Sequence, residues 1–275
     1  MKDVGTAGVS FIIPVSQSRY VPLLANCLAS IKAQNHCAET FFEYVLVYIY
    51  RKGEEETIDE LSGLFELVCQ YGATLVSYEH ELEDYPLALA RNVGARRSTR
   101  RFLAFVDADI VLDPKTIPAC MDCVPRAGGA AHCLVYRMPE EFGPSSNIFR
   151  PDQIWKEFRK NREKGKLDLD GRGGFLYITR ELFFYMRGYD EDFVGWGGED
   201  TDMHQRLDNH FQHLPGSRTV HLSTNREIFG MHQWHPHKPD YKRFTNRNRK
   251  LLGSKLSIVR NDHAFWGGVG IKSNK

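Results

Sequence analysis

The chain has 275 residues, of which 42% are hydrophobic and 26% are charged, and its formal net charge is +1 at pH 7. This length can bury a sizeable core, and the composition is that of an ordinary globular protein. Because 36 Lys and Arg residues balance 35 Asp and Glu residues, no overall basic bias points to nucleic acid as a partner.

The N-terminus lacks the charged start and apolar core of a signal peptide, and no run approaches the roughly 20 apolar residues that span a bilayer. We therefore expect a cytoplasmic protein.

Its six cysteines do not form a disulfide-dense pattern. Cys120 and Cys123 form a C-x-x-C pair close to His132 and Cys133, which is a set that zinc can use. A second C-x-x-C is missing, so we favour reduced, partly buried thiols.

Short apolar runs alternate with helical patterns over the first 106 residues. Runs rich in β-branched and aromatic residues predict strands at residues 9–15, 44–50, 73–78 and 102–106. Apolar residues at helical spacing predict helices between them, at residues 20–33, 54–71 and 86–99. This order predicts an α/β fold with a mostly parallel, Rossmann-like sheet that is flanked by helices on both faces.

The rhythm changes after about residue 113. Proline and glycine are dense between residues 114 and 151, and the elements expected beyond them are helices at 153–164, 181–186 and 201–209 and a strand at 175–179. The chain has no internal repeat, and the second part reads as a continuation that covers the sheet edge. We expect one domain over residues 1–275, with a first half of about 1–113 and a second half of about 114–275.

Two carboxylates, Asp107 and Asp109, follow the fourth predicted strand on either side of Ala108. Ligands of parallel sheets bind beyond the carboxyl ends of the strands, so this is where a binding site is expected. Paired carboxylates suit a hard divalent cation, which bridges substrate phosphates and neutralises charge on a departing diphosphate. A purely structural surface turn is the alternative for an isolated Asp-x-Asp.

A turn with three glycines and a tryptophan precedes the helix expected at 201–209. Gly197 and Gly198 permit backbone conformations and close ligand approach that other residues do not, and Trp196 offers a flat face to a sugar ring. Glu199 and Asp200 are placed at a helix N-terminus, where carboxylates are favoured as ions. A carboxylate beside an acceptor hydroxyl can take its proton during attack. Helix capping is the alternative, but this turn holds more than a cap requires.

Three histidines lie within residues 232–237. Imidazole is a frequent ligand of borderline metals such as manganese, so one of them could complete the coordination that the aspartates begin. His232 is the first choice, because it lies nearest the preceding apolar run, and His235 is the second. Arg91 and Arg19 are candidates for contacts with phosphate through their planar guanidinium groups, with a surface salt bridge as an equally good explanation.

In their order along the chain, these motifs resemble the GT-A nucleotide-sugar glycosyltransferases of the family 2 type. The resemblance rests on I-P at residues 13–14, A-R-N-x-G at 90–94 and F-V-D-A-D at 105–109. The later motifs, G-G-F at 173–175 and W-G-G-E-D at 196–200, are similar to those of β-galactosyltransferases and bacterial chondroitin polymerases.

The resemblance implies a single GT-A domain with a nucleotide-sugar half and an acceptor half. It implies inverting transfer of a sugar, Gal or GalNAc, from a UDP-sugar to a glycan or glycolipid-linked acceptor, with Mn²⁺ (or Mg²⁺) as cofactor. In this reading Asp109 and His232 bind the metal, Asp200 is the base, and Glu199 and Trp196 bind substrate together with Gly197 and Gly198. The implied nucleotide-binding residues are Pro14, Val15, Arg19, Arg91, Asp107 and Ala108.

Alternatives stay open at this point. Val15-Ser16-Gln17 and Tyr50-Arg51 depart from the usual family residues around the nucleoside, so guanosine competes with uridine. A nucleotidyltransferase also pairs acidic metal ligands with an α/β sheet, although residues 15–19 lack the glycine and lysine that would hold a triphosphate. A carbohydrate-binding protein without catalysis is a third reading. The basic stretch at residues 243–255 leaves peripheral membrane contact open.

Overall fold

The protein is described by a computed structural model over residues 6–34, 41–127, 129–142, 164–168, 173–214, 219–236, 243–255, 257–262 and 266–268. Its centre is a seven-stranded sheet of order β10-β6-β9-β4-β1-β2-β3. These strands are β1 (Thr6–Val15), β2 (Phe42–Arg51), β3 (Thr74–His80), β4 (Arg100–Val106), β6 (Ala130–His132), β9 (Phe175–Thr179) and β10 (Thr219–His221). Neighbours pair in parallel except at β9, which is antiparallel to both β4 and β6. The prediction of a mostly parallel sheet is confirmed.

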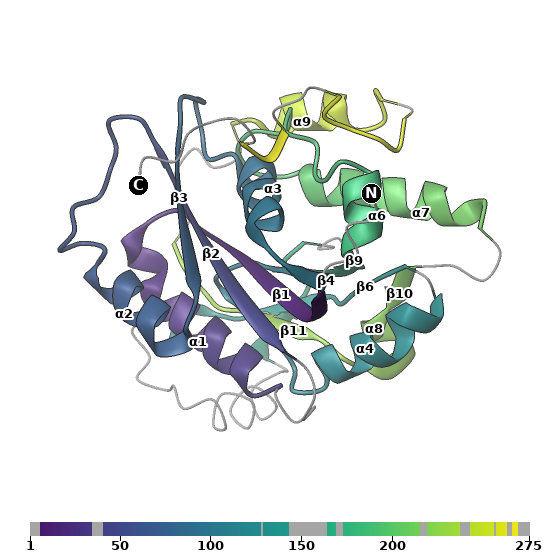
Figure 1. Ribbon diagram of the computed structural model, residues 1–275, viewed down its shortest axis with the longest axis horizontal. Coiled ribbons are helices and arrows are strands. Elements are labelled where there is room, and N and C mark those ends of the chain that lie inside the picture. Colours follow the sequence, from purple (N-terminus) through teal and green to yellow (C-terminus); the bar gives the residue numbers. More distant parts are fainter. Residues whose placement is uncertain are drawn as a thin grey trace.

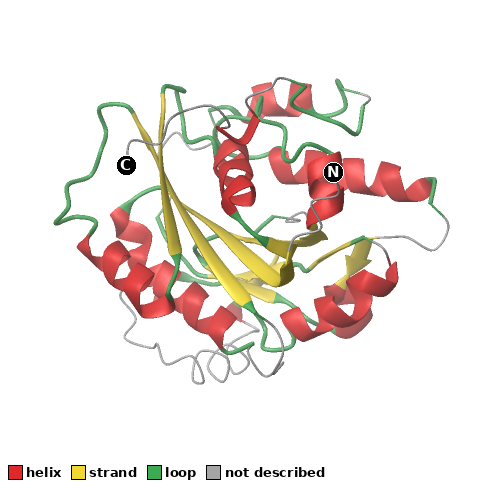
Figure 2. Cartoon of the chain, in the orientation of Figure 1, coloured by secondary structure: helices red, strands yellow, loops and turns green. Residues whose placement is uncertain are grey.

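Helices cover both faces of this sheet (Figures 1 and 2). Those of the described residues are α1 (Val21–Lys32), α2 (Ser62–Tyr71), α3 (Leu87–Arg97), α4 (Thr116–Ala127), α6 (Arg180–Tyr185), α7 (Glu199–Gln212), α8 (Leu222–Arg226) and α9 (Thr245–Leu251). Alternate residues of β1 face opposite layers, as the strand period requires. Phe11 and Ile13 pack with α1, α2 and α4, whereas Ile12 packs with α3, α6 and α7.

A second, four-stranded sheet of order β5-β11-β7-β8 lies beyond the end of β4. Its strands are β5 (Ile110–Val111), β7 (Val135–Arg137), β8 (Lys166–Leu167) and β11 (Gly230–His232). β5 follows β4 after only three residues, and β11 pairs antiparallel with it, so that His232 lies opposite Ile110. This pairing brings a segment from late in the chain to the end of the fourth strand.

Two of the predicted elements need correction. The helix expected at residues 54–71 begins only at Ser62, and two acidic residues before it are bonded elsewhere, one locally and one to a distant serine. Glu60 accepts hydrogen bonds from the amide and hydroxyl of Thr57, and Glu56 accepts bonds from the amide and hydroxyl of Ser18. The proline-rich stretch after residue 113 contains a helix that we did not expect, α4. Pro118 lies in its first turn, where a missing amide proton costs no helical bond.

The C-x-x-C pair lies on α4, where Cys120 is buried and Cys123 is partly buried. The helix expected at 153–164 lies outside the described residues except for its last position.

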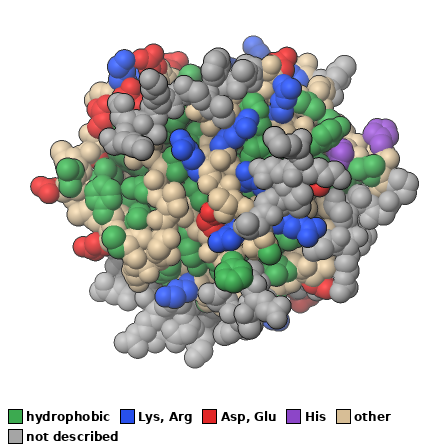
Figure 3. Space-filling model, in the orientation of Figure 1, with side chains coloured by type: hydrophobic (Ala, Val, Ile, Leu, Met, Phe, Trp, Pro, Cys, Tyr) green, Lys and Arg blue, Asp and Glu red, His purple; other side chains and the backbone are tan. Residues whose placement is uncertain are grey.

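None of the helices in the described parts of the chain is long and apolar enough to cross a bilayer. Figure 3 shows Lys and Arg side chains together with Asp and Glu side chains among apolar groups on one face, as the balanced charge leads us to expect.

Candidate active site

A carboxylate and two imidazoles meet where β4 ends. Asp109 Oδ2 lies 3.0 Å from His235 Nε2 and 3.5 Å from His232 Nε2. Asp109, His232 and His235 each offer one potential ligand atom, and these three atoms all lie within 4.8 Å of one another. Within the described parts of the chain, this trio is the group of side chains that could hold a metal ion. Both histidines therefore approach the same oxygen of the aspartate, although the sequence favoured His232 over His235 as the metal ligand.

Gln233 lies between the two histidines in the sequence and anchors their segment to the rest of the protein through hydrogen bonds. Its amide donates to the carbonyl of Asp109 (2.9 Å), and its side-chain nitrogen donates to the carbonyl of Leu23 (3.1 Å). Asn26 on α1 donates to the side-chain oxygen of Gln233 at 2.5 Å. Gln233 and Asn26 are 1% and 2% exposed, so their polar groups are hydrogen-bonded inside the protein. These bonds fix the segment that carries the metal-type cluster, by which we mean Asp109, His232 and His235. The sequence assigned no role to Asn26, and Gln233 was noted only as the neighbour of His232.

The electrostatics of the cluster favour an ionised aspartate. Burial raises the pKa of Asp109, but the adjacent His232 and His235 outweigh burial and hold it below its ordinary value. Burial lowers the pKa of His235, and its hydrogen bond to Asp109 outweighs that and raises the pKa. The second carboxylate oxygen of Asp109, Oδ1, is buried and has no hydrogen-bond partner among the described residues. The chain thus offers an ionised, incompletely satisfied carboxylate beside two imidazoles.

Arg91 joins the two acidic motifs. Its guanidinium, 2% exposed, lies with Nη2 at 2.7 Å from Asp107 Oδ1 and Nη1 at 2.7 Å from Asp200 Oδ1. Glu199 Oε1 is 3.5 Å from the same Nη1, and the ring of Tyr189 lies under the guanidinium at 4.9 Å. The sequence left both a phosphate contact and a salt bridge open for Arg91. The structure gives both terminal nitrogens carboxylate partners, so Arg91 bridges the end of β4 and the start of α7, and its contact with a nucleotide stays a prediction.

Asp107, Glu199 and Asp200 share the single cation of Arg91, and as a result one of the three carboxyl groups keeps its proton. Burial raises the pKa of Glu199 to about 8, the charge of Asp200 adds to the shift, and Arg91 opposes it. Burial likewise raises the pKa of Asp107 against the lowering effect of Arg91. Asp200 and Asp107 are the nearer partners of the guanidinium, so Glu199 is the carboxyl that holds a proton near neutral pH.

We expect Glu199→Gln to stabilise the protein progressively relative to the wild type as the pH rises from 5 to 8. Between the ordinary value of 4.5 and the folded value of about 8, Glu199 binds a proton only in the folded state. The wild type therefore loses unfolding free energy with rising pH, by at most about 1.4 kcal/mol per pH unit, and glutamine has no proton to lose. Urea unfolding at four pH values measures this, with the exposed Glu181→Gln as control. Parallel curves for wild type and Glu199→Gln would refute it.

The glycine-rich turn leads directly into α7. Gly198 occupies the position before the helix with φ of 105°, which disfavours any other residue, and a Cβ there would lie 2.7 Å from Phe193. Gly173 makes room for the base candidate, because a Cβ on it would lie 2.5 Å from Asp200 Oδ2. Trp196 stands out from the turn with 46% of its surface exposed. A flat apolar face is thus available beside the Glu199-Asp200 pair.

The remaining candidates for nucleotide binding lie around the same sheet edge. Pro14 and Val15 end β1 and are buried, and Ala108 packs partly against the core. Arg19 is exposed and lies over the ring of Tyr20 at 4.9 Å. Tyr20 in turn contacts the ring of His235 edge-on, with centroids 5.4 Å apart. Arg19 is therefore near the metal-type cluster, and its contact with a nucleotide stays a prediction.

Sequence reasoning missed two tyrosines of the site. Tyr85, between β3 and α3, has a buried hydroxyl with no hydrogen-bond partner among the described residues, and its carbonyl accepts a bond from the Gly195 amide. Tyr189 supports Arg91 from below. Asn92, next to Arg91 in the sequence motif, binds the backbone of Tyr189 through both ends of its side chain.

Two family models match the chain. The model of glycosyl transferase family 2 matches residues 10–185, and the model described as N-terminal domain of galactosyltransferase matches residues 161–227. A validoxylamine A glucosyltransferase of Streptomyces hygroscopicus subsp. jinggangensis is 27% identical over 219 residues, covering 66% of this chain and 49% of that protein. Chondroitin synthase of Escherichia coli is 22% identical, covering 78% of this chain and 34% of that protein. The chain therefore spans about half the length, or less, of these curated relatives.

Solved structures share the fold. A mannosyltransferase from Pyrobaculum calidifontis, in complex with GDP-Man and Mn²⁺, superposes with a TM-score of 0.54 at 19% identity, covering 91% of this chain and 63% of that chain. The catalytic domain of Drosophila β1,4-galactosyltransferase 7, in complex with xylobiose, gives a TM-score of 0.51 at 13% identity and covers 92% and 83%. The expected GT-A fold is confirmed. Since the family model covers more than half of its residues, this chain belongs to glycosyl transferase family 2.

Proposed function

We propose that this chain is an inverting, metal-dependent glycosyltransferase, which moves a sugar from a UDP-sugar to a hydroxyl of a glycan or glycoconjugate acceptor. One observation carries the proposal: Arg91 links Asp107, in the metal-type motif, to Asp200, in the W-G-G-E-D turn, with two contacts of 2.7 Å. Donor and acceptor chemistry thereby meet in one place. Residues of about 1–113 form the nucleotide-sugar half in this proposal, and about 114–275 form the acceptor half.

Asp109, His232 and His235 would hold the cofactor. The buried Oδ1 of Asp109 lacks a protein partner among the described residues, and its Oδ2 lies within 3.5 Å of both histidine nitrogens. One carboxylate and two imidazoles suit a borderline divalent ion, and Mg²⁺ prefers oxygen ligands alone, so Mn²⁺ fits this set better. When bound, the ion neutralises charge that develops on the leaving diphosphate.

Asp200 is the base in this proposal. Its Oδ1 accepts from Arg91, while its Oδ2 lies so close to Gly173 that a side chain at that position would collide with it. The carboxylate of Asp200 can take the proton of the acceptor hydroxyl as it attacks. An attack opposite to the leaving diphosphate inverts the anomeric carbon and gives a β-linkage from an α-linked donor.

Glu199 and Trp196 complete the acceptor side. Glu199 keeps a proton near neutral pH, so its carboxyl can donate a hydrogen bond to a sugar as well as accept one. The exposed face of Trp196 suits a sugar ring. The galactosyltransferase model matches the segment that holds both residues, which supports Gal or GalNAc as the transferred sugar.

UDP release from a set of UDP-sugars tests the proposal. We expect UDP-Gal or UDP-GalNAc to yield UDP in the presence of Mn²⁺, faster when a glycan acceptor is added. The same assay with GDP-Man checks guanosine, because the Pyrobaculum structure holds that nucleotide sugar. If donors bind and no nucleotide is released with any acceptor, the proposal of catalysis is wrong.

Manganese is expected to support nucleotide binding better than magnesium. Titration of UDP by calorimetry, with either ion at the same concentration, should give at least about a tenfold tighter complex with Mn²⁺, because two of the three ligands are imidazoles. EDTA should weaken binding, and Mn²⁺ should restore it. Equal UDP affinity in Mn²⁺, Mg²⁺ and EDTA would contradict the assignment of this cluster as a metal site.

A further inference from the structure

Helix α9 binds the backbone of the glycine-rich turn through one side chain. The side-chain nitrogen of Asn248 donates to the carbonyls of Gly197 (2.7 Å), Val194 (3.2 Å) and Trp196 (3.4 Å). Asn248 is 1% exposed. Its side-chain oxygen accepts no hydrogen bond from the described residues, so its NH₂ group alone makes these contacts. One buried amide thus fixes three carbonyls on either side of Trp196.

Packing around the turn leaves little room for rearrangement. A Cβ on Gly195 would lie 2.6 Å from the ring of Phe244, which precedes α9, and a Cβ on Gly198 would lie 3.3 Å from Asn248 Cβ. The Gly195 amide is in turn bonded to the carbonyl of Tyr85 at 3.2 Å. The turn that presents Trp196 therefore contacts α9 on one side and the loop after β3 on the other, while Gly197 faces open space.

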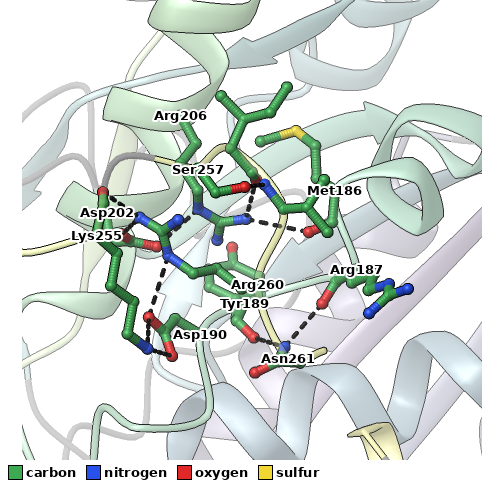
Figure 4. A network of polar contacts seen from close by, with 12 residues as sticks. Met186, Arg187, Tyr189, Asp190, Asp202, Arg206, Lys255, Ser257, Arg260 and Asn261 are labelled. Atoms are coloured by element: carbon green, nitrogen blue, oxygen red, sulfur yellow. Dashed lines mark hydrogen bonds and ion pairs between the residues drawn. The ribbon is translucent and has the colours of Figure 1, made fainter. Parts of the chain in front are cut away.

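The segment after α9 holds the other side of the catalytic pair. Arg260 Nη2 lies 2.9 Å from Asp202 Oδ1, and Arg260 Nε lies 3.2 Å from Asp190 Oδ2. Asp202 also pairs with Arg206 at 2.8 Å (Figure 4). These side chains are at most 5% exposed, and Asp202 belongs to the first turn of α7, two residues after Asp200. The C-terminal segment thus contacts the chain before and after Glu199-Asp200.

We propose that Asn248 is a positioning residue for the acceptor side of the site: it fixes the turn that presents Trp196 and starts α7 at the base. This inference rests on the proposed function for its catalytic meaning. Asn248 contacts the turn and not the cluster of Asp109 and the histidines. Its substitution should therefore affect sugar transfer separately from metal and nucleotide binding. Loss of the three bonds should disturb transfer and leave metal and nucleotide binding intact.

Asn248→Asp is the sharpest variant. It keeps the shape of the side chain and replaces the donating NH₂ group with an oxygen that faces three carbonyl oxygens. Asn246→Asp is the matched control, because it makes the same change on an exposed position of the same helix. Asn248→Ala, which removes the donor without adding charge, serves as a second variant should the aspartate prevent folding.

Hydrogen exchange of the Gly195 amide reports on the turn without any need for substrate. We expect exchange at Gly195 to accelerate about tenfold or more in Asn248→Asp, while the amides of β1 and β4 keep their protection. Calorimetry should give an unchanged affinity for UDP with Mn²⁺, and UDP release from UDP-Gal should slow about tenfold. The control should behave as the wild type in all three measurements.

Two results would overturn the inference. Exchange at Gly195 that matches the control would show that Asn248 does not hold the turn. A parallel loss of UDP affinity and of release rate would show a general structural role. If the wild type itself releases no UDP from any donor, the proposed function fails, while the exchange measurement still decides whether Asn248 holds the turn.

Discussion

Asp200→Asn is expected to lower the rate of transfer by about 10²- to 10⁴-fold, which is the range that a general base contributes. Asparagine has nearly the same shape and can still accept a hydrogen bond from Arg91, whose Nη1 lies 2.7 Å from Asp200 Oδ1. It cannot take the proton of the acceptor hydroxyl. Affinity for UDP with Mn²⁺ should stay within about twofold, because the variant leaves Asp109 and both histidines unchanged.

Asp208→Asn provides the control for this variant, because it removes an exposed carboxylate from the same helix, α7. Steady-state rates with saturating donor and acceptor, together with calorimetry of UDP binding, measure both expectations. An Asp200→Asn enzyme that transfers sugar at the wild-type rate would remove Asp200 from the mechanism. Slow hydrolysis of the donor by water is measured separately, without acceptor, and subtracted.

Arg91→Met is expected to destabilise the protein by about 3–5 kcal/mol, the usual cost of removing one partner from a buried ion pair. The guanidinium is 2% exposed and is the shared partner of Asp107, Asp200 and Glu199. Without it, the buried Glu199 and the partly exposed Asp107 and Asp200 have no cation among them. Arg91 opposes the rise in the pKa values of Glu199 and Asp107 that burial causes, so both pKa values rise further in the variant, which then loses stability as the pH rises.

The loss of unfolding free energy in Arg91→Met should therefore be larger at pH 8 than at pH 5, which urea unfolding at both values measures. Arg97→Met removes an exposed arginine from the last turn of the same helix and should change little. A loss of stability that is the same for both variants, or the same at both pH values, would show that Arg91 does not compensate the acidic cluster.

The central strands of the main sheet could be predicted from the sequence because they are largely buried on both faces, whereas β6 and β10, of three residues each, were not predicted. Strands that are buried on both faces read as continuous apolar runs, and β1, β2 and β4 each contain one. The alternation of strands and helices then leaves few parallel topologies. The acidic motif at residues 107–109 also follows from this logic, since it comes directly after the fourth strand.

The second sheet could not be predicted, because its strands have only two or three residues and carry no pattern of their own. Its formation depends on tertiary pairing between β5 and β11, which are about 120 residues apart. That pairing is what brings the histidine segment to Asp109. The sequence could thus suggest which residue types bind a metal, but not that His235 approaches Asp109 more closely than His232 does.

The position of Arg91 was beyond the sequence for a related reason. Its partners come from the end of β4 and the start of α7, and they converge only because α3 and α7 cover the same face of the sheet. The neighbouring sequence looks the same for a buried arginine that pairs with carboxylates and for an exposed arginine that binds phosphate. The division of the chain near residue 113 into two functional halves stays a prediction.

The central claim is that Asp109, His232 and His235 bind one ion together with the nucleotide. Electron paramagnetic resonance of free Mn²⁺, titrated into the protein with UDP, tests it most directly. We expect one tightly bound Mn²⁺ per chain in the wild type and at least about a tenfold weaker complex in His232→Ala and in His235→Ala. Tight binding that survives both substitutions, or Mn²⁺ that stays free with UDP present, would contradict the account.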